Sequence, residues 1–136
     1  DDFAQPARLR LSQDRLVCLE ERIDLELRLG RGAELVAELE QLVRDHPFRE
    51  RLCGQLMTAL YRAGRQSDAL RAFHRTRAIL IDQVGVEPGP ELTAIERQVL
   101  THDPQLTATT TTPTLAIIIF VFLLIGIFEY YTVNLM

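Results

Sequence analysis

The chain has 136 residues, of which 47% are hydrophobic and 25% are charged, and its net charge at pH 7 is −4. This length suits one domain of ordinary globular composition, and the acidic balance argues against a strongly basic protein that coats nucleic acid. Two Cys residues are too few for a disulfide scaffold.

Charge divides the chain into two parts. All 15 cationic residues are Arg and lie between Arg8 and Arg97, whereas Glu129 is the only charged residue after Asp103. We therefore expect a soluble domain over residues 4–103, followed by an apolar tail. The sequence opens with Asp rather than Met and shows no signal peptide. We expect it to belong to a longer protein with a further domain upstream.

The soluble part carries five stripes of apolar residues at spacings of three and four, which predict amphipathic helices. The stripes run over residues 16–27, 36–43, 52–63, 69–84 and 92–99. Ser12 suits the N-cap of the first helix, and Pro90 suits the first turn of the fifth. Gly30 ends the first helix, and we expect Gly64 and Gly85 to take left-handed conformations at later helix ends. No alternation of β-branched residues predicts a strand, so the predicted fold class is all-α.

The chain repeats itself at an offset of 34 residues, which is the period of tetratricopeptide repeats. Gly30 matches Gly64 at this offset, and Leu39 matches Phe73. Ala69 and Phe73 supply a small and a large residue where paired helices of this repeat pack together. We therefore expect tetratricopeptide-like hairpins completed by a fifth helix, with these residues in structural roles. An ordinary five-helix bundle is the alternative.

Three runs of sequence occur together in the soluble part. They are HPFRERL at 46–52, LMTALYRAGRQSDAL at 56–70 and GVEPGPEL at 85–92. Together they resemble the bacterial transcriptional activation domain over residues 7–100. The resemblance implies the tetratricopeptide-like regulatory domain of antibiotic-regulatory-type activators, which dimerises and contacts the transcription machinery. It also implies that DNA is bound by a winged helix-turn-helix domain upstream of this chain.

Positive charge is concentrated in one segment, with a net of +4 over residues 62–77. In the fourth predicted helix, Arg71, His74 and Arg75 are expected to form a basic ridge that binds an acidic partner or DNA phosphates. A solvated helix face without a partner is an equally good interpretation. Tyr61 ends the third helix and is expected either to pack in the core or to contact a bound peptide.

Other polar and turn residues are expected to be structural. Arg77 flanks the apolar stripe of its helix and needs a carboxylate or carbonyl partner there. Pro88, after Gly85, is expected to set the angle at which the fifth helix returns. Asp24 and Arg28 have the i, i+4 spacing of an ion pair within one helix.

The sequence predicts no enzyme. His46, His74 and His102 are each 28 residues apart, so no pair has the i, i+4 spacing of a helical metal site. The sequence contains neither a Gly-rich phosphate loop nor a Gly-x-Ser-x-Gly elbow. We therefore expect no catalytic residue, no metal and no cofactor, and we expect protein partners instead.

The tail differs in character from the soluble part. Residues 104–114 read as a Thr-rich linker, and residues 115–128 contain no polar side chain. Extended to Val133, this stretch has 19 residues, close to the roughly 20 that span a bilayer. We predict a transmembrane helix over 115–133 that anchors a cytoplasmic helical domain to the cell membrane, with a shifted reading frame as the alternative explanation. The alternative function is a membrane-tethered tetratricopeptide scaffold unrelated to transcription.

Overall fold

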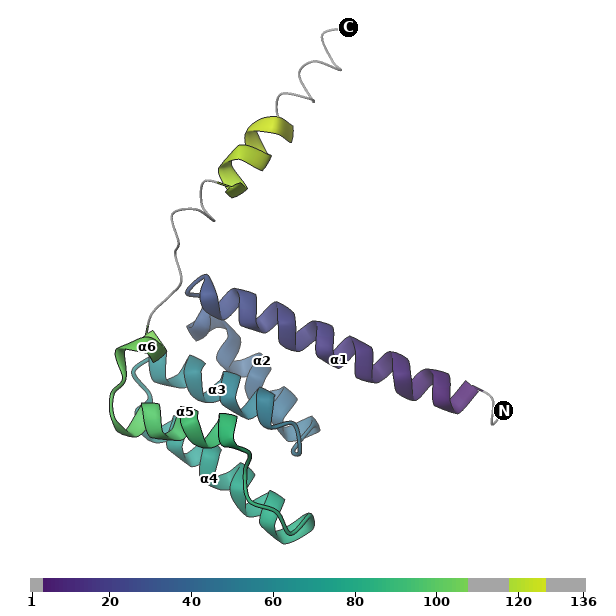
Figure 1. Ribbon diagram of the computed structural model, residues 1–136, viewed down its shortest axis with the longest axis vertical. Coiled ribbons are helices and arrows are strands. Elements are labelled where there is room, and N and C mark those ends of the chain that lie inside the picture. The colour runs from purple at the N-terminus through teal and green to yellow at the C-terminus, as the bar shows by residue number, and fades with distance from the viewer. Residues whose placement is uncertain (1–3, 108–117, 127–136) are drawn as a thin grey trace, which may run out of the picture.

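The computed structural model describes residues 4–107 and 118–126, and all of the regular structure in these ranges is helical (Figure 1). The helices of the domain are α1 (Ala4–Arg28), α2 (Gly32–Asp45), α3 (Glu50–Arg62), α4 (Gln66–Gln83), α5 (Pro90–Leu100) and α6 (Pro104–Thr107). A further helix covers residues 118–126. The prediction of an all-α fold is therefore confirmed for the described residues.

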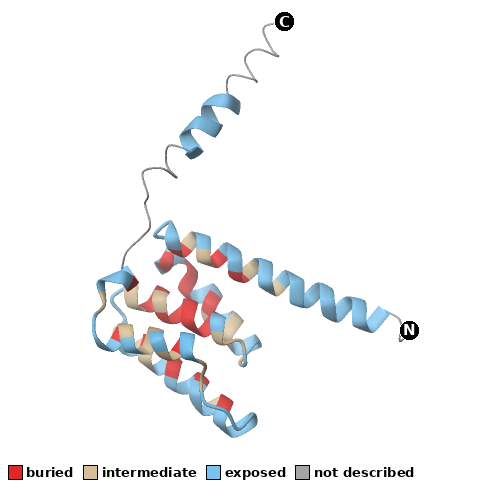
Figure 2. Cartoon of the chain, in the orientation of Figure 1, coloured by how far each residue is buried: buried red, intermediate tan, exposed pale blue. Residues whose placement is uncertain are grey.

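α3 is the central helix of the domain. Each of α1, α2, α4, α5 and α6 packs against it, and Figure 2 shows buried residues gathered along its length. Eight of its 13 residues are buried, namely Leu52, Cys53, Gly54, Gln55, Leu56, Met57, Ala59 and Leu60. Burying one large apolar side chain contributes about 1.5–3 kcal/mol, so this helix supplies much of the stability of the core.

Two hairpins, α1–α2 and α3–α4, turn in the same way 34 residues apart. Gly30 and Gly64 have φ angles of 83° and 75°, which cost a non-Gly residue about 1–2 kcal/mol. Each donates its N–H to a carbonyl three residues back, Leu27 at 3.1 Å and Tyr61 at 2.9 Å. The next residue in each turn donates to a carbonyl five residues back, at 3.0 and 2.8 Å. The 34-residue repeat is thus visible in the backbone as well as in the sequence.

α1 begins earlier than the sequence predicted. Ser12 lies inside this helix, where its hydroxyl donates to the Leu9 carbonyl at 3.0 Å, so the prediction that it caps the helix is wrong. Pro6 does not prevent the earlier start, because a proline is tolerated in the first turn of a helix. Residues 4–15 are all exposed, and this half of α1 extends beyond the packed helices (Figure 2).

The segment between α4 and α5 is joined to the start of α3. Gly85 has a φ of 75° and ends α4, as the sequence predicted. Gly89 donates its backbone N–H to Glu50 Oε2 at 2.6 Å. Pro90 is the first residue of α5, whose Leu92 then enters the core with 2% of its surface exposed.

The packed domain continues past Asp103. Residues 104–107, expected to open the linker, form α6, and Leu106 is only 6% exposed. The Leu106 carbonyl accepts a hydrogen bond from Arg62 Nε at 2.7 Å, which fixes α6 to the end of α3. Helix α6 was missed because its four residues are too few to show an apolar period.

Within residues 4–107 and 118–126, no helix has the length and apolar character needed to cross a membrane. Of the span predicted at 115–133, only residues 118–126 belong to the described part of the chain.

Candidate functional site

A groove of about 660 Å³ lies between α2 and α4, and we call it the α2–α4 groove. It is lined by Glu40, Val43, Arg44, Pro47, Leu56, Leu60, Arg65, Asp68, Arg71, Ala72, Arg75, Thr76 and Ile79. Two residues of the predicted basic ridge, Arg71 and Arg75, are among them. They share one face of α4 because they are four residues apart in a helix.

The groove combines an apolar floor with a basic rim. Leu56 and Leu60 of α3 lie at its base but are only 4% and 2% exposed. Its accessible apolar surface therefore comes from the half-buried Val43 of α2 and Ile79 of α4. Around this floor the rim carries four Arg and two acidic residues. An apolar partner surface would therefore meet the floor while its charged margin met the arginines.

The charges on the rim are only partly compensated. Asp68 accepts hydrogen bonds from Arg71 and from Arg65, and both lower the pKa of its carboxyl group. Arg65 also lies 4.0 Å from Glu40. Arg75 is exposed, and no ion pair joins it to an acid of the described domain. The lining thus holds two carboxylates against four guanidinium groups, and the groove keeps a positive excess.

His74 does not belong to the same surface. It lies on the side of α4 near α5, where it lines a smaller hollow with Arg77, Glu87 and Pro88. Its ring lies 5.5 Å from that of Phe73 in an edge-to-face arrangement. His74 is exposed like Arg71 and Arg75, but it lines a different hollow from theirs, so a contact with the same partner stays a prediction.

The structure places Arg77 against a carboxylate in the α4–α5 loop. Its Nε and a terminal nitrogen each lie 2.7 Å from an oxygen of Glu87, a two-point contact. The pair raises the pKa of Arg77 and lowers that of Glu87. Pro88 follows directly and is half-buried, so this contact holds the loop that leads into α5.

Tyr61 lies at the end of α3, away from the α2–α4 groove. Its side chain is half-buried and packs against the core. The hydroxyl lies 3.5 Å from His102 Nδ1, and the two rings are 6.4 Å apart. This position connects α3 with the segment after α5.

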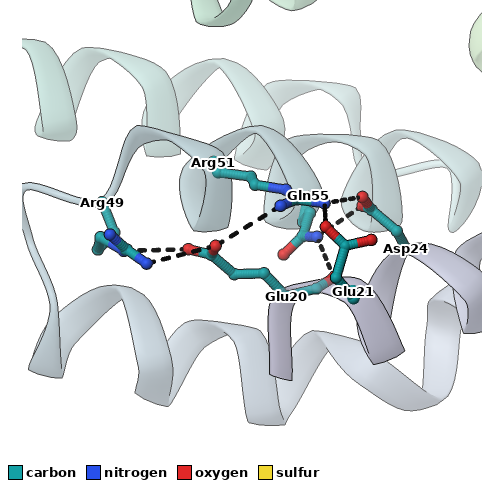
Figure 3. A network of polar contacts seen from close by, with 6 residues as sticks. All are labelled: Glu20, Glu21, Asp24, Arg49, Arg51 and Gln55. Carbon is teal, nitrogen blue, oxygen red and sulfur yellow. Dashed lines mark hydrogen bonds and ion pairs between the residues drawn. The ribbon is translucent and has the colours of Figure 1, made fainter. Parts of the chain in front are cut away.

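Sequence reasoning missed a polar cluster that joins α1 to α3 (Figure 3). The Glu20 side chain is 4% exposed, and its carboxylate accepts hydrogen bonds from Arg49 Nε at 3.1 Å and a terminal nitrogen at 3.4 Å. Asp24 pairs with Arg51 at 2.5 Å and accepts a hydrogen bond from Gln55 at 2.6 Å. The sequence predicted that Asp24 pairs with Arg28 of its own helix, but the packing of α1 on α3 pairs it with Arg51.

A second groove, of about 580 Å³, lies on the opposite side of α3, between α1 and α5. We call it the α1–α5 groove. Its charges are balanced, with acids at Asp24, Glu50 and Glu91 and bases at Arg28, Arg51 and Arg62. Several of them already serve contacts within the domain, such as the Asp24–Arg51 pair. This groove therefore offers a partner less unpaired charge than the α2–α4 groove.

Within the described part of the chain, no three His, Cys, Asp or Glu side chains are grouped so as to hold a metal ion. The titratable groups with displaced pKa values are Arg and Asp or Glu residues of ion pairs, the partly buried Arg62 and the buried Cys53.

Comparison with known proteins gives one consistent result. The sequence profile of the bacterial transcriptional activator domain matches residues 1–100. The regulatory protein AfsR of Streptomyces coelicolor is 46% identical over 119 residues, which is 83% of this chain and 12% of AfsR. The regulatory protein DnrI of Streptomyces peucetius is 45% identical over 95 residues, or 70% of this chain and 35% of DnrI.

A solved structure has a similar fold. It is Mycobacterium tuberculosis EmbR in complex with a low affinity phosphopeptide, with a TM-score of 0.74 and 36% sequence identity. The similarity covers 86% of this chain and 32% of that one. In each of these comparisons the chain corresponds to a minor part of a longer protein.

Proposed function

The chain belongs to the bacterial transcriptional activator domain family, and we propose that it forms the protein-binding regulatory part of a larger transcriptional activator. The match of the family over residues 1–100 carries this proposal. The relatives AfsR and DnrI, which are named as regulatory proteins, support it. We propose that the domain works in the cytoplasm through self-association and through contact with the transcription machinery.

The fold is suited to this role. Two hairpins and α5 enclose a single core around α3, and stacked helical hairpins of the tetratricopeptide kind present grooves that bind proteins. The α2–α4 groove offers both apolar surface and charge, which is the usual composition of a protein-binding site. No cofactor or bond-making step enters the proposal.

DNA binding is assigned to another part of the activator. The first 103 residues carry 18 acids against 15 Arg, a net charge of −3, which repels the phosphate backbone. None of the five longer helices, α1 to α5, is rich in the Arg, Asn and Gln side chains that read base edges. Sequence-specific binding therefore depends on a winged helix-turn-helix domain outside this chain.

A fusion experiment tests the proposal. The chain is joined to an unrelated sequence-specific DNA-binding domain, and transcription is measured from a bacterial reporter that carries the matching site. Activation above the level of the DNA-binding domain alone is expected, together with dimerisation of the fused chain in sedimentation. A fusion that folds, occupies its site and does not raise transcription would contradict the proposal.

A membrane-tethered scaffold without a role in transcription is not favoured, because the relative EmbR is named as a transcriptional regulatory protein and AfsR and DnrI as regulatory proteins. The anchor predicted at 115–133 is compatible with either role. We keep it as a separate prediction of the sequence.

A further inference from the structure

From the shape and charge of the α2–α4 groove, we infer that its occupant is an acidic amphipathic helix of a partner protein. The inference rests on the proposed function, because it names the kind of surface that such a regulatory domain binds. Three features of the groove lead to it: the floor, the rim and the position of Arg75.

The floor selects an apolar side of the partner. The half-buried Val43 of α2 and Ala72 and Ile79 of α4 present apolar surface to the groove. The buried Leu56 and Leu60 of α3 close its base. A ligand made only of phosphates and sugars would leave this apolar surface without a matching contact. A row of apolar side chains at i, i+3, i+4 and i+7 covers it, which is how a helix fills a groove between two others.

The rim selects the charge of the partner. Arg44, Arg71 and Arg75 surround the floor together with Arg65, while Glu40 and Asp68 are the acids that line the groove. Asp68 is already engaged by two of these arginines. Carboxylates on a partner would find guanidinium groups with spare donors, and opposite charges of this kind guide association and set its orientation.

Arg75 is the clearest anchor point. It is exposed and forms no ion pair with another described residue of the domain, while Arg71 one turn earlier keeps 73% of its side chain exposed. Two guanidinium groups one turn apart match two acids one turn apart on a facing helix.

Other occupants fit less well. DNA would meet the two acids of the rim as well as its arginines, and it would desolvate the floor without filling it. The apolar stretch 115–128 of this chain has no charge and would bury the arginines without partners, which is costly. DNA binding is kept as an outcome of the test.

Binding of a designed peptide tests the inference on the full chain. The probe is a fluorescent helical peptide of about 16 residues, roughly four turns, with Leu along one face and Glu on its flanks. A sister peptide carries Gln in place of every Glu, and a DNA duplex of random sequence serves as a third probe. We expect the acidic peptide to bind, with an affinity that falls as salt is raised, and we expect the Gln peptide to bind about tenfold more weakly.

Matched variants locate the binding. The double substitution Arg71→Gln with Arg75→Gln should weaken binding of the acidic peptide about tenfold. The control, Arg10→Gln with Arg15→Gln, removes the same charge from the exposed part of α1 and should change the affinity less than about twofold. Methyl NMR of the unmodified chain gives a readout that needs no variant. The methyl signals of Val43 and Ile79 should shift, and those of Leu92 and Ile95 in the α1–α5 groove should not.

Four results would overturn the inference. They are equal binding of the acidic and Gln peptides, no effect of the Arg71 and Arg75 changes, shifts confined to the α1–α5 groove, and DNA binding stronger than peptide binding through the same arginines. The reporter fusion separates this inference from the proposed function. If the fused chain activates transcription with or without the Arg71 and Arg75 substitutions, the inferred acidic helix is wrong and the proposed regulatory function stands. If the fused chain never activates transcription, the proposed function is wrong, and the peptide experiments still show whether the α2–α4 groove binds an acidic helix.

Discussion

The guanidinium group of Arg49 lies against the carboxylate of Glu20, with Nε 3.1 Å from Oε1, although 29 positions separate the two residues in the sequence. The Glu20 side chain is 4% exposed, whereas that of Arg49 is 38% exposed. The pair therefore joins the middle of α1 to the start of α3 from the inner side, and the exposed half of α1 has no comparable contact.

Removal of Arg49 should destabilise the domain more than removal of a surface arginine. Arg49→Ala leaves the buried Glu20 with only the more distant Arg51, at 3.8 Å. We expect the free energy of unfolding to fall by about 2 kcal/mol. This is less than the 3–5 kcal/mol lost when a fully buried pair is broken, because Arg49 reaches solvent. Urea unfolding followed by circular dichroism measures it. Arg22→Ala, which removes an exposed arginine that pairs with Glu26 and Glu38, is the control and should cost less than about 1 kcal/mol. Equal losses for the two variants would contradict the prediction.

Phe73 should be among the most sensitive core positions. Its side chain is 4% exposed and belongs to the core that α3 shares with α4. Phe73→Ala should cost about 3–5 kcal/mol, because both the transfer free energy and the packing around the vacated space are lost. Phe48→Ala removes the same ring from a position that is 50% exposed and should cost far less. A thermal melt in which the Phe73 variant unfolds with the unaltered chain would refute the packing described for α4.

Gly64 should resist substitution for a backbone reason alone. No atom lies within 4 Å of the place that a Cβ would occupy, but its φ is 75°. Gly64→Ala should therefore cost about 1–2 kcal/mol in unfolding free energy from conformation and not from a clash. Gly32 has no positive φ, and an added Cβ would meet its nearest neighbour, Ala59 Cα, at 3.5 Å. Gly32→Ala is thus the matched control, and a loss as large as that at Gly64 would show that the turn is not the cause.

The two thiols should differ sharply in reactivity. Burial raises the pKa of Cys53 from 9.0 to about 11, so its reactive thiolate is scarce at pH 8. Cys18 is exposed on α1. Ellman's reagent at pH 8 should modify one thiol rapidly in the folded chain and two in urea. Cys18→Ser should abolish the rapid phase, and rapid loss of both thiols from the folded chain would place Cys53 nearer the surface than described.

The tail prediction is tested by a truncation whose end the structure sets. The chain should be cut after Thr107 and not after Asp103, because Leu106 is part of the core. If residues 115–133 form an anchor, the full chain should resist extraction by alkaline carbonate while the shortened chain remains soluble. A full chain released by carbonate would exclude the anchor and leave the helical domain as it is.

Local sequence was enough to predict the five longer helices, though not the start of α1, together with the turns and the period of the hairpins. Apolar spacing marked five helices, and Gly64 and Gly85 marked turns that require a left-handed residue. The family followed from three runs of sequence and was confirmed by the match over residues 1–100. These properties depend on residues that are neighbours along the chain, so a single sequence contains them.

Tertiary structure decided which side chains share a surface. Arg71 and Arg75 line the α2–α4 groove together with residues of α2 and α3, while His74 lines a hollow with residues of α5 and the loop before it. The partner of Glu20 comes from 29 residues away, and Leu106 reaches the core through a helix too short to show a period. Such contacts arise from the packing of whole helices on α3, and no spacing within one helix encodes them.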